Sequence, residues 1–501
     1  MAPGELESLE PVAWDKRSWG ARSYAVLWVG IVASPSTFIQ GGALLNLGLS
    51  WWEALLAQLL ASLVTVVVLI ANALAGARYG IPFPVYARAA FGVQGAKIIA
   101  VVRGIIAMGW LSINLYVGAS AVNSFLLVAC GHSSWVARSP ELDTNLSLVQ
   151  AVLLLAFVAL HAVVIRGGVH RMRVITTFLA PLQVIGFGSL AVWALVNTSV
   201  SDLVKVSGTF TVPTEDRSFA LSFAFAVTGS VSGWSTMCMN IADLSRYATG
   251  KRAVVAGQFP AMPIINTVVP LFGIVAVCAA KVLYGTDDWD LSSIFVHFPA
   301  PVAFLYAVLT AVSLLACNCL ANIVSPANDF ANLLPERISF RGAAYFALCA
   351  SLAFCPWRVL STPDGFVTRF LVAYSGITGA ILGVMLVDFF MIRKQVLDVE
   401  QLYDPDSTEY GSGYNAASFL TTALAIAPCV PGLVANLGGF ELAPVWMNLY
   451  GTAFFTCLAL AAGLLLPIRK AMSWLTCSVR TPEQVPLSPS IGVSIGHVCR
   501  K

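Results

Sequence analysis

The sequence predicts an all-α, polytopic membrane protein, and three observations carry that prediction. Of the 501 residues, 58% are hydrophobic and 11% are charged, and the mean hydropathy is +0.81, which is too apolar for an ordinary soluble domain. The apolar residues lie in long runs separated by short polar segments. Lys and Arg gather in alternate segments between those runs, as the positive-inside rule expects of cytoplasmic loops.

The apolar runs predict about twelve transmembrane helices, because roughly 20 apolar residues cross the hydrocarbon core of a bilayer. The runs cover residues 24–45, 52–76, 98–127, 148–166, 174–196, 219–241, 254–283, 301–324, 342–357, 366–392, 416–436 and 445–467. Both termini fall on the basic, cytoplasmic side. The N-terminal segment has neither the apolar core of a signal peptide nor an Arg/Ser-rich transit pattern, so we expect the plasma membrane.

Composition excludes several classes of function. The formal net charge of +3 is too small to suggest a nucleic-acid partner. The 11 Cys are scattered without CxxC spacing, which favours small buried residues over disulfides or zinc. No His, Asp or Glu spacing typical of a metal site occurs, and the isolated His161 in the fourth span is interpreted as a packed polar group. We therefore expect no metal, no cofactor and no enzymatic activity.

The first span is interrupted near its middle. Pro35 removes a backbone donor and breaks the helix there. Backbone groups freed inside a membrane are tolerated only where protein or a water-filled cavity surrounds them. The proline is surrounded by polar and small residues: Ser34, Ser36, Thr37, Gly41 and Gly42.

The sixth span is also unusual, in the stretch GSVSGWSTMCMNIADLSRY at 229–247. Gly229 and Gly233 weaken a helix, so we expect this span to unwind at its glycines. Interrupted spans in positions one and six are what an inverted repeat of five plus five helices places at a midplane binding site. Pro and Gly are common in membrane helices, so either interruption alone would not define a site.

The third and eighth spans carry polar pairs at helical spacing. Trp110 and Asn114 are one turn apart and share a face, as are Asn318 and Asn322. Unpaired amides are costly in lipid, so these side chains are expected to face the interior. They are either interhelical hydrogen-bonding groups or part of a site.

Several motifs resemble the nucleobase:cation symporter-1 family, in its Fur-like branch, from Ser18 to about Arg469. The most specific is RYGIPFPVYARAAFGVQGA at 78–96. The others, in order, are GWLSIN at 109–114, GWSTMCMNIADLSRYA at 233–248, AN-x-x-SP-x-ND at 321–329, PW at 356–357, VDFFMIRK at 387–394 and LY…Y…GYN at 402–415.

The resemblance implies an APC/LeuT-like fold, in which spans one to ten form the inverted repeat and two further helices are peripheral. Residues 1–20 would be a cytoplasmic N-terminal segment, 21–393 the transporter core, 394–470 a cytoplasmic loop with the two peripheral helices, and 471–501 a disordered cytoplasmic tail. Members of the family import planar heterocycles such as uracil, purines, allantoin or hydantoins by alternating access.

The resemblance also assigns roles to individual residues. Trp110 and Trp234 match the tryptophans that sandwich the flat ring, since a π-face holds any planar base. Asn322 matches the residue that hydrogen-bonds the amide edge of the ring, and an Asn offers both a donor and an acceptor for it. Asn114 stands where the family often has Gln, which leaves the exact substrate open.

Two further residues complete the implied substrate site. Ser34 matches a polar first-span position of some relatives. Gly233 would offer its backbone carbonyl through the broken sixth helix.

The cation site departs from the family pattern. The positions that resemble the sodium ligands of relatives are Gly30, Ala33, Ser313, Ala316 and Cys317. Ala316 and Cys317 bring no oxygen, which a hard cation such as sodium requires, so proton coupling is favoured. The carboxylates in or beside spans are proton-carrier candidates, and none is singled out: Glu53, Asp243, Asp329 and Asp388.

The leading hypothesis is a proton-coupled importer of a nucleobase or related ureide, with membrane lipids as its surroundings and the oligomeric state left open. One alternative is a sodium-coupled hydantoin or nucleobase symporter. Another is an amine or amino-acid carrier of the same fold, against which the tryptophan pair argues. A membrane enzyme or a receptor without flux has no support from the motifs.

Overall fold

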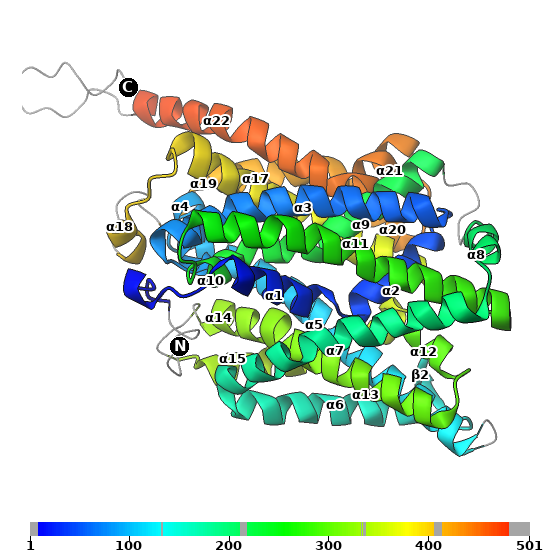
Figure 1. The fold of residues 1–501 in the computed structure, drawn as a ribbon. Coiled ribbons are helices and arrows are strands. Elements are labelled where there is room, and N and C mark those ends of the chain that lie inside the picture. The colour runs from blue at the N-terminus through cyan, green and yellow to red at the C-terminus, as the bar shows by residue number, and fades with distance from the viewer. Residues whose placement is uncertain are drawn as a thin grey trace, which may run out of the picture.

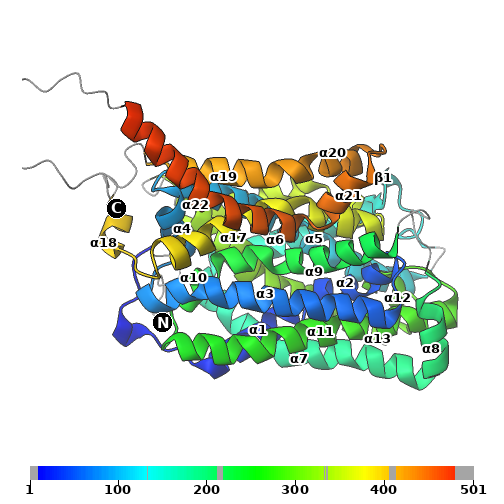
Figure 2. The same ribbon diagram turned by 90° about the horizontal axis from the view of Figure 1, so that it is seen from above.

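The computed structural model describes residues 9–131, 134–210, 218–331, 333, 337–404 and 413–479, with side chains except at 168–181, 320 and 474–479. Long helices run roughly side by side from one end of the molecule to the other, and the short elements gather at the two ends (Figure 1). The view turned by 90° shows the same arrangement, with α19 and α22 along one edge of the bundle (Figure 2).

The first half of the chain forms nine helices and one small hairpin within the described residues. The helices are η1 (Trp14–Lys16), α1 (Ala21–Val32), α2 (Pro35–Leu45), α3 (Trp51–Tyr79), α4 (Phe83–Phe91), α5 (Gly95–Cys130), α6 (Leu148–Arg166), α7 (Gly168–Asn197) and α8 (Val200–Ser207). Between α5 and α6, strands β1 (Glu141–Asp143) and β2 (Leu146–Ser147) pair antiparallel, with Glu141 opposite Ser147.

The second half is helical throughout its described part. Its elements up to the tenth predicted span are α9 (Phe219–Asn240), α10 (Ala242–Ser245), α11 (Lys251–Tyr284), α12 (Leu291–Phe295), α13 (Ala300–Cys317), η2 (Asn318–Val324), α14 (Ser325–Ala331), α15 (Phe340–Ala350), η3 (Ser351–Phe354), α16 (Pro356–Val359), η4 (Gly365–Leu371), α17 (Val372–Val387) and η5 (Asp388–Ile392). The remainder comprises α18 (Val399–Tyr403), α19 (Ala416–Ile426), η7 (Ala427–Cys429), α20 (Val430–Gly438), α21 (Pro444–Gly451) and α22 (Ala453–Val479).

Each predicted span coincides with a helix or a run of adjoining helices. Among the described residues, eight helices are long and apolar enough to cross a membrane, or up to ten if each of two bent pairs counts as one span. The two remaining predicted spans correspond to α9 and to the shorter apolar helix Phe340–Phe354. The prediction of an all-α polytopic membrane protein is confirmed, and the length and composition of the helices support eight to ten spans.

The predicted interruption of the first span is confirmed. α1 ends at Val32, α2 begins at Pro35, and the two axes differ by 59°. Pro35 has no N–H to continue α1, and Ser34 has extended backbone angles that turn the chain. Ser34 then caps α2, because its Oγ accepts a hydrogen bond from the backbone N of Thr37 at 3.4 Å.

The predicted unwinding of the sixth span at its glycines is wrong, because α9 is one continuous helix from Phe219 to Asn240. Two of its serines bond back to the helix: Oγ of Ser232 donates to the carbonyl of Thr228 at 2.6 Å, and Oγ of Ser235 donates to the carbonyl of Ser232 at 3.0 Å. Gly229 serves close packing, as a Cβ there would meet Val367 Cγ1 at 3.0 Å.

The sixth span is interrupted instead at Ile241, between α9 and α10. The carbonyls of Cys238 and Met239 near this helix end are satisfied by Nδ2 of Asn72 on α3, at 2.7 and 2.9 Å. The side chain of a neighbouring helix thus replaces the lost backbone donors at the break.

Small residues set the distance between α2 and α11. A Cβ on Gly41 would collide with the backbone of Pro270, and a Cβ on Gly273 would collide with the backbone of Phe38. Only glycine allows the two helices to approach so closely. This contact holds the second half of the broken first span against the bundle.

The last helix is longer than predicted. α22 continues to Val479, whereas we placed the start of a disordered tail at residue 471. The added residues contain neither Pro nor Gly, and the next Pro is Pro482, so nothing local ends the helix earlier. The rest of the predicted tail, 480–501, lies outside the described residues.

Candidate functional site

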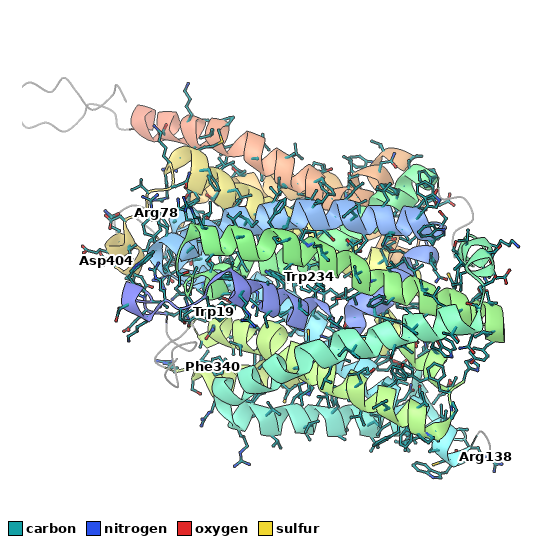
Figure 3. The ribbon with its side chains drawn as sticks, in the orientation of Figure 1. Trp19, Arg78, Arg138, Trp234, Phe340 and Asp404 are labelled. Atoms are coloured by element: carbon teal, nitrogen blue, oxygen red, sulfur yellow. The ribbon has the colours of Figure 1, made fainter. Side chains whose placement is uncertain are left out.

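A cavity lies where α1, α2, α5, α9 and the α13–η2 segment meet. It is lined by Ile31, Ser34, Ser36, Thr37, Gln40, Trp110, Asn114, Gly233, Trp234, Thr236, Met237, Cys317, Ala321 and Asn322. Trp234 lies about midway between the two ends of the bundle (Figure 3). All six residues predicted for the substrate site line this single cavity.

Trp110 is held by its ring nitrogen. Its Nε1 donates to the hydroxyl of Tyr374 at 3.0 Å, and that hydroxyl donates to the carbonyl of Ser232 at 2.7 Å. The rings of Phe366 and Phe370 pack against the indole edge-on, with centroids 6.2 and 5.5 Å away. These contacts satisfy the polar edge of the indole and fix its plane, while the residue still lines the cavity.

Trp234 is also held by a hydrogen bond from its ring nitrogen. Its Nε1 donates to Oδ1 of Asn266 at 2.8 Å, and Nδ2 of Asn266 donates to Ser62 at 2.8 Å. Trp28 packs edge-on against it at 5.8 Å. Both cavity indoles therefore have satisfied N–H groups, and a ligand would meet their apolar surfaces rather than their donors.

Three asparagines form one hydrogen-bonded cluster, the amide wall (Asn114, Asn318 and Asn322). Oδ1 of Asn318 accepts from Nδ2 of Asn114 at 2.9 Å and from Nδ2 of Asn322 at 3.0 Å. Oγ of Ser36 donates to Oδ1 of Asn114 at 2.5 Å. Asn114 and Asn322 line the cavity and Asn318 lies behind them, fully buried.

Ser34 and Gly233 also line the cavity, but in different ways from those expected. Ser34 caps α2, and its hydroxyl lies 3.1 Å from that of Thr37. The carbonyl of Gly233 is not released by a broken helix, because α9 is intact there. A Cβ at Gly233 would lie 3.9 Å from Trp110 and from Gln40, so the glycine instead leaves room beside the indole.

Four further polar residues line the cavity, and the sequence analysis gave none of them a role in the substrate site: Ser36, Thr37, Gln40 and Thr236. Gln40 is buried, and its Nε2 donates to Ser230 at 3.2 Å. The sequence signal that could have identified Gln40 is its polar side chain, which follows the break at Pro35 inside a predicted membrane span. Thr236 follows Trp234 by two positions and belongs to the polar stretch of the sixth span.

The predicted cation-site remnant is filled by a side chain. The carboxamide of Gln183, on α7, is oriented by its neighbours, so that its nitrogen donates to the carbonyls of Ala33 at 2.8 Å and Gly30 at 3.2 Å. Its oxygen accepts from Oγ of Ser313 at 3.2 Å. We call this group the amide plug: Gln183 with Gly30, Ala33 and Ser313.

The other two predicted cation-site residues bring no oxygen from their side chains. Ala316 is fully buried, and Cys317 lines the substrate cavity instead. The residues around Gln183 therefore do not fit a bound sodium ion in this arrangement, because the side-chain nitrogen of Gln183 already donates hydrogen bonds to the two carbonyl oxygens. Among the described residues there is also no group of three or more His, Cys, Asp or Glu that could hold a metal ion.

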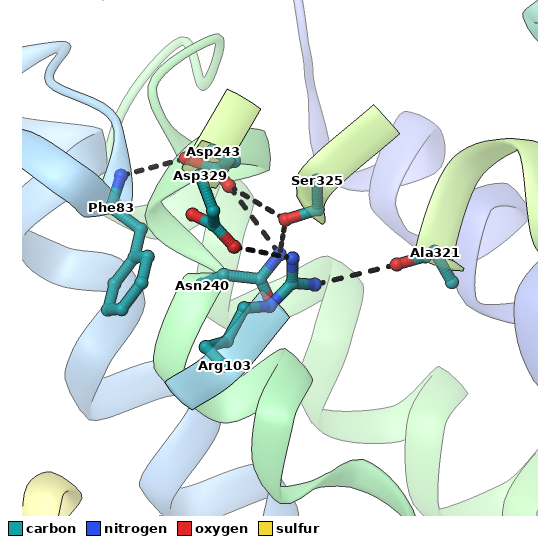
Figure 4. A network of polar contacts seen from close by, with 7 residues as sticks. All are labelled: Phe83, Arg103, Asn240, Asp243, Ala321, Ser325 and Asp329. Carbon is teal, nitrogen blue, oxygen red and sulfur yellow. Dashed lines mark hydrogen bonds and ion pairs between the residues drawn. The ribbon is translucent and has the colours of Figure 1, made fainter. Parts of the chain in front are cut away.

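A buried charged network lies toward the end of the bundle that carries α4, α10 and α14. Arg103 on α5 pairs with Asp329 on α14 at 3.0 Å, and both side chains are almost completely buried. Arg103 also donates to the carbonyl of Ala321, a cavity residue, at 3.4 Å. The network joins Phe83, Arg103, Asn240, Asp243, Ala321, Ser325 and Asp329 (Figure 4).

The other carboxylates considered from the sequence also have protein partners. Oδ1 of Asp243 accepts from the backbone N of Phe83 at 2.8 Å, where α4 begins. Glu53 forms a capping box with Ser50 at the start of α3. Asp388 pairs with Arg393 at 2.7 Å. All four acids thus have protein partners, and none lines the cavity.

A long apolar bundle with a broken first helix and a polar, indole-lined cavity at mid-depth is the architecture of a membrane transporter. The family model for permeases of cytosine/purines, uracil, thiamine and allantoin matches residues 11–456. The chain belongs to that family, the nucleobase–cation symporter-1 permeases. It is therefore a secondary transporter and not an enzyme.

Two curated relatives illustrate the range of the family. The chain is 32% identical over 455 residues to an allantoin permease of Bacillus subtilis, covering 90% of each chain. It is 27% identical over 456 residues to a purine-uracil permease of Arabidopsis thaliana, covering 90% of this chain and 75% of the other.

Solved structures match the fold. Mhp1, a transporter of the same family in a closed conformation with bromovinylhydantoin bound, superposes with a TM-score of 0.70 at 19% identity, covering 94% of this chain and 96% of the other. The inward-facing conformation of Mhp1 gives a TM-score of 0.72 at 19% identity, covering 92% and 93%. The LeuT-like fold predicted from the sequence is thereby confirmed.

Proposed function

We propose that this protein imports a planar heterocycle of the allantoin, uracil or purine class by alternating access, together with a proton. The observation that carries the proposal is the cavity itself, which brings Trp110, Trp234, Asn114 and Asn322 together from three separate helical segments. The indoles offer flat apolar faces, and the amides offer hydrogen-bonding groups for a ring edge. The similarity to allantoin and purine-uracil permeases supports the same substrate classes.

The test is radiolabelled uptake of allantoin, uracil, adenine, guanine and cytosine in cells that lack endogenous transport. We expect Trp110→Ala and Trp234→Ala each to reduce uptake of the accepted substrate about 10-fold to 100-fold, since stacking on one aromatic side chain contributes roughly 1–3 kcal/mol. The matched control is Trp52→Ala, at an exposed position on α3. Unchanged uptake in both cavity variants, at equal surface expression, would refute the site.

Proton coupling is supported by the amide plug. The carbonyls of Gly30 and Ala33 are those a coupling cation would use at a helix break, and here they accept from Gln183. Replacing external sodium by choline should leave uptake unchanged, whereas collapsing the proton gradient should abolish it. Loss of uptake on sodium removal alone would favour the alternative, a sodium-coupled hydantoin or nucleobase symporter.

We further propose that both ends of the chain face the cytoplasm, in the plasma membrane. The segment before α1 and the end of α22 lie at the same end of the bundle (Figure 1). Cys130, exposed at the far end of α5, would then be extracellular. A membrane-impermeant maleimide should label Cys130 in intact cells, and labelling only after permeabilisation would reverse the orientation.

An amine or amino-acid carrier of the same fold is the second candidate. It is disfavoured because the cavity residues include two indoles and no charged side chain. Competition of the labelled heterocycle by amino acids, with no competition by allantoin or uracil, would favour it.

A further inference from the structure

His161 is a buried titratable side chain that the proposed transport cycle does not use. It lies on α6 and is 0% exposed. Its Nδ1 is 2.8 Å from the backbone carbonyl of Phe157. A carbonyl oxygen can only accept, so Nδ1 carries the hydrogen, and Nε2 of the neutral ring is an acceptor.

This acceptor determines the orientation of Asn318. The side-chain nitrogen of Asn318 lies 3.1 Å from Nε2 of His161, so the amide must donate there. Oδ1 of Asn318 is consequently turned to the other side, where only donors fit. The two groups found there are the Nδ2 atoms of Asn114 and Asn322.

The same reasoning applies to the side-chain amides of Asn114 and Asn322, which line the cavity. Because Nδ2 of Asn114 and Nδ2 of Asn322 each give a hydrogen to Asn318, their oxygens point away from it. Oδ1 of Asn114 accepts from Ser36. Oδ1 of Asn322 accepts no hydrogen bond from any described residue, and it is not among the polar atoms sealed off inside the protein.

We propose that His161 and Asn318 are positioning residues that fix the direction of the amide wall. They hold Asn322 with its oxygen available to a ligand, so the cavity selects heterocycles that present a ring N–H at that point. Neither residue lines the cavity, so both act through Asn114 and Asn322. The inference rests on the proposed function, since it concerns how the heterocycle is chosen.

A purely structural role for His161 makes a different prediction. If the ring only joins α6 to η2, its loss weakens the binding of every ligand by the same factor. If it sets the direction of the amides, its loss lets them rotate and reduces the difference between ligands with and without the N–H. The ratio of two affinities separates these cases and does not depend on expression level.

The experiment measures inhibition of labelled substrate uptake by uracil, 1-methyluracil and 3-methyluracil. We expect the wild type to bind at least one methylated analogue about 10-fold more weakly than uracil or worse, because the analogue leaves a buried acceptor unpaired. In His161→Phe, which keeps the edge-on packing against Phe157 at 4.6 Å, the ratio should fall to about 2–3-fold. In His161→Gln, whose amide oxygen can accept from Asn318, the ratio should stay closer to that of the wild type.

Asn318→Ser provides a second variant, because a serine hydroxyl is too short to join His161 to both amides. It should lower the ratio as His161→Phe does, and it keeps the test valid if His161→Phe does not fold. The matched control is Asn72→Leu, which removes a buried amide bonded to carbonyls of α9 and should leave the ratio unchanged.

The outcomes separate the two proposals. Failure of the wild type to transport any heterocycle overturns the proposed function. Transport with an unchanged ratio in both His161→Phe and Asn318→Ser overturns the positioning role and leaves the proposed function standing.

Discussion

The amide wall and the amide plug are both built from side-chain carboxamides, but the hydrogen bonds of these carboxamides are used differently. In the plug, the carboxamide of Gln183 meets two carbonyls and a hydroxyl, and its donors and acceptor are directed at protein groups. In the wall, three carboxamides are joined to one another, and the oxygen of Asn322 has no donor within the described part of the chain. The difference teaches that the pairing of buried amides, rather than their presence, decides whether a polar region of a membrane bundle closes or accepts a ligand.

The largest effect is expected where the buried groups are charges. Arg103→Leu would leave Asp329 buried without its cation, at a cost to the free energy of unfolding of about 3–5 kcal/mol. We expect a strong loss of folded protein, measured by fluorescence-detected size exclusion in detergent. Recovery of most of the folded protein in the double variant Arg103→Leu, Asp329→Leu would support this cause, and equal loss in both would contradict it.

The second prediction breaks the amide wall. Asn322→Ala removes the oxygen left available to the ligand, and we expect the apparent affinity for the substrate to fall about 10-fold to 100-fold. Protein stability should change less, because among the described residues the side chain hydrogen-bonds to Asn318 alone. Uptake kinetics with surface quantification provide the measurement. A normal affinity in this variant would show that the wall does not contact the ligand.

The third prediction breaks the amide plug. Gln183→Ala leaves two carbonyls and a hydroxyl without partners, at a cost of about 1–3 kcal/mol in stability. It also opens a group of oxygens of the kind that holds sodium at helix breaks. We expect sodium to raise the melting temperature of this variant and not that of the wild type, with potassium as the ionic control. A sodium response in the wild type would contradict the plug.

The smallest effect is expected at the surface, where water can replace lost partners. Asp143 on β1 accepts from Arg358 at 2.8 Å and from Trp357 at 2.7 Å. These hydrogen bonds lower the pKa of Asp143 from 3.8 to about 2. The stabilisation is therefore present above about pH 4 and is lost as the pH falls toward 2.

Asp143→Asn should accordingly lower the melting temperature only slightly at pH 7, since exposed ion pairs contribute little. The difference between the variant and the wild type should shrink below pH 4 and vanish near pH 2. A large difference at pH 7, or one that persists at pH 2, would show that this contact has a role beyond an exposed ion pair.

Much of the fold could be predicted from local chemistry. Apolar runs located the helices, and Pro35 located the first break because a missing N–H acts within its own turn. The sixth-span prediction failed since Gly229 and Gly233 have two uses, flexibility and close packing, and only the neighbours decide between them. In α9 the close contact between Gly229 and Val367, and the hydrogen bond from Ser232 back to its own helix, favour packing in a continuous helix.

The cavity residues could be predicted in part for a similar reason. Trp110 with Asn114 and Asn318 with Asn322 follow helical spacing, which a sequence displays directly. Gln183 and His161 could not be given their partners, because each acts across helices that are far apart in the chain. His161 is a packed polar group, as expected, but the sequence could not show that it bonds to the back of the amide wall.

The most direct test of the central claim, that this cavity holds the heterocycle, is protection of Cys317 from alkylation. Cys317 lines the cavity, while Cys130 is exposed at the end of α5 and provides an internal reference. Peptide-level mass spectrometry would follow maleimide labelling of both in the purified protein, with and without saturating substrate. We predict that the substrate slows labelling of Cys317 and leaves Cys130 unaffected. Labelling of Cys317 at the same rate, under conditions in which the substrate is bound, would contradict the site.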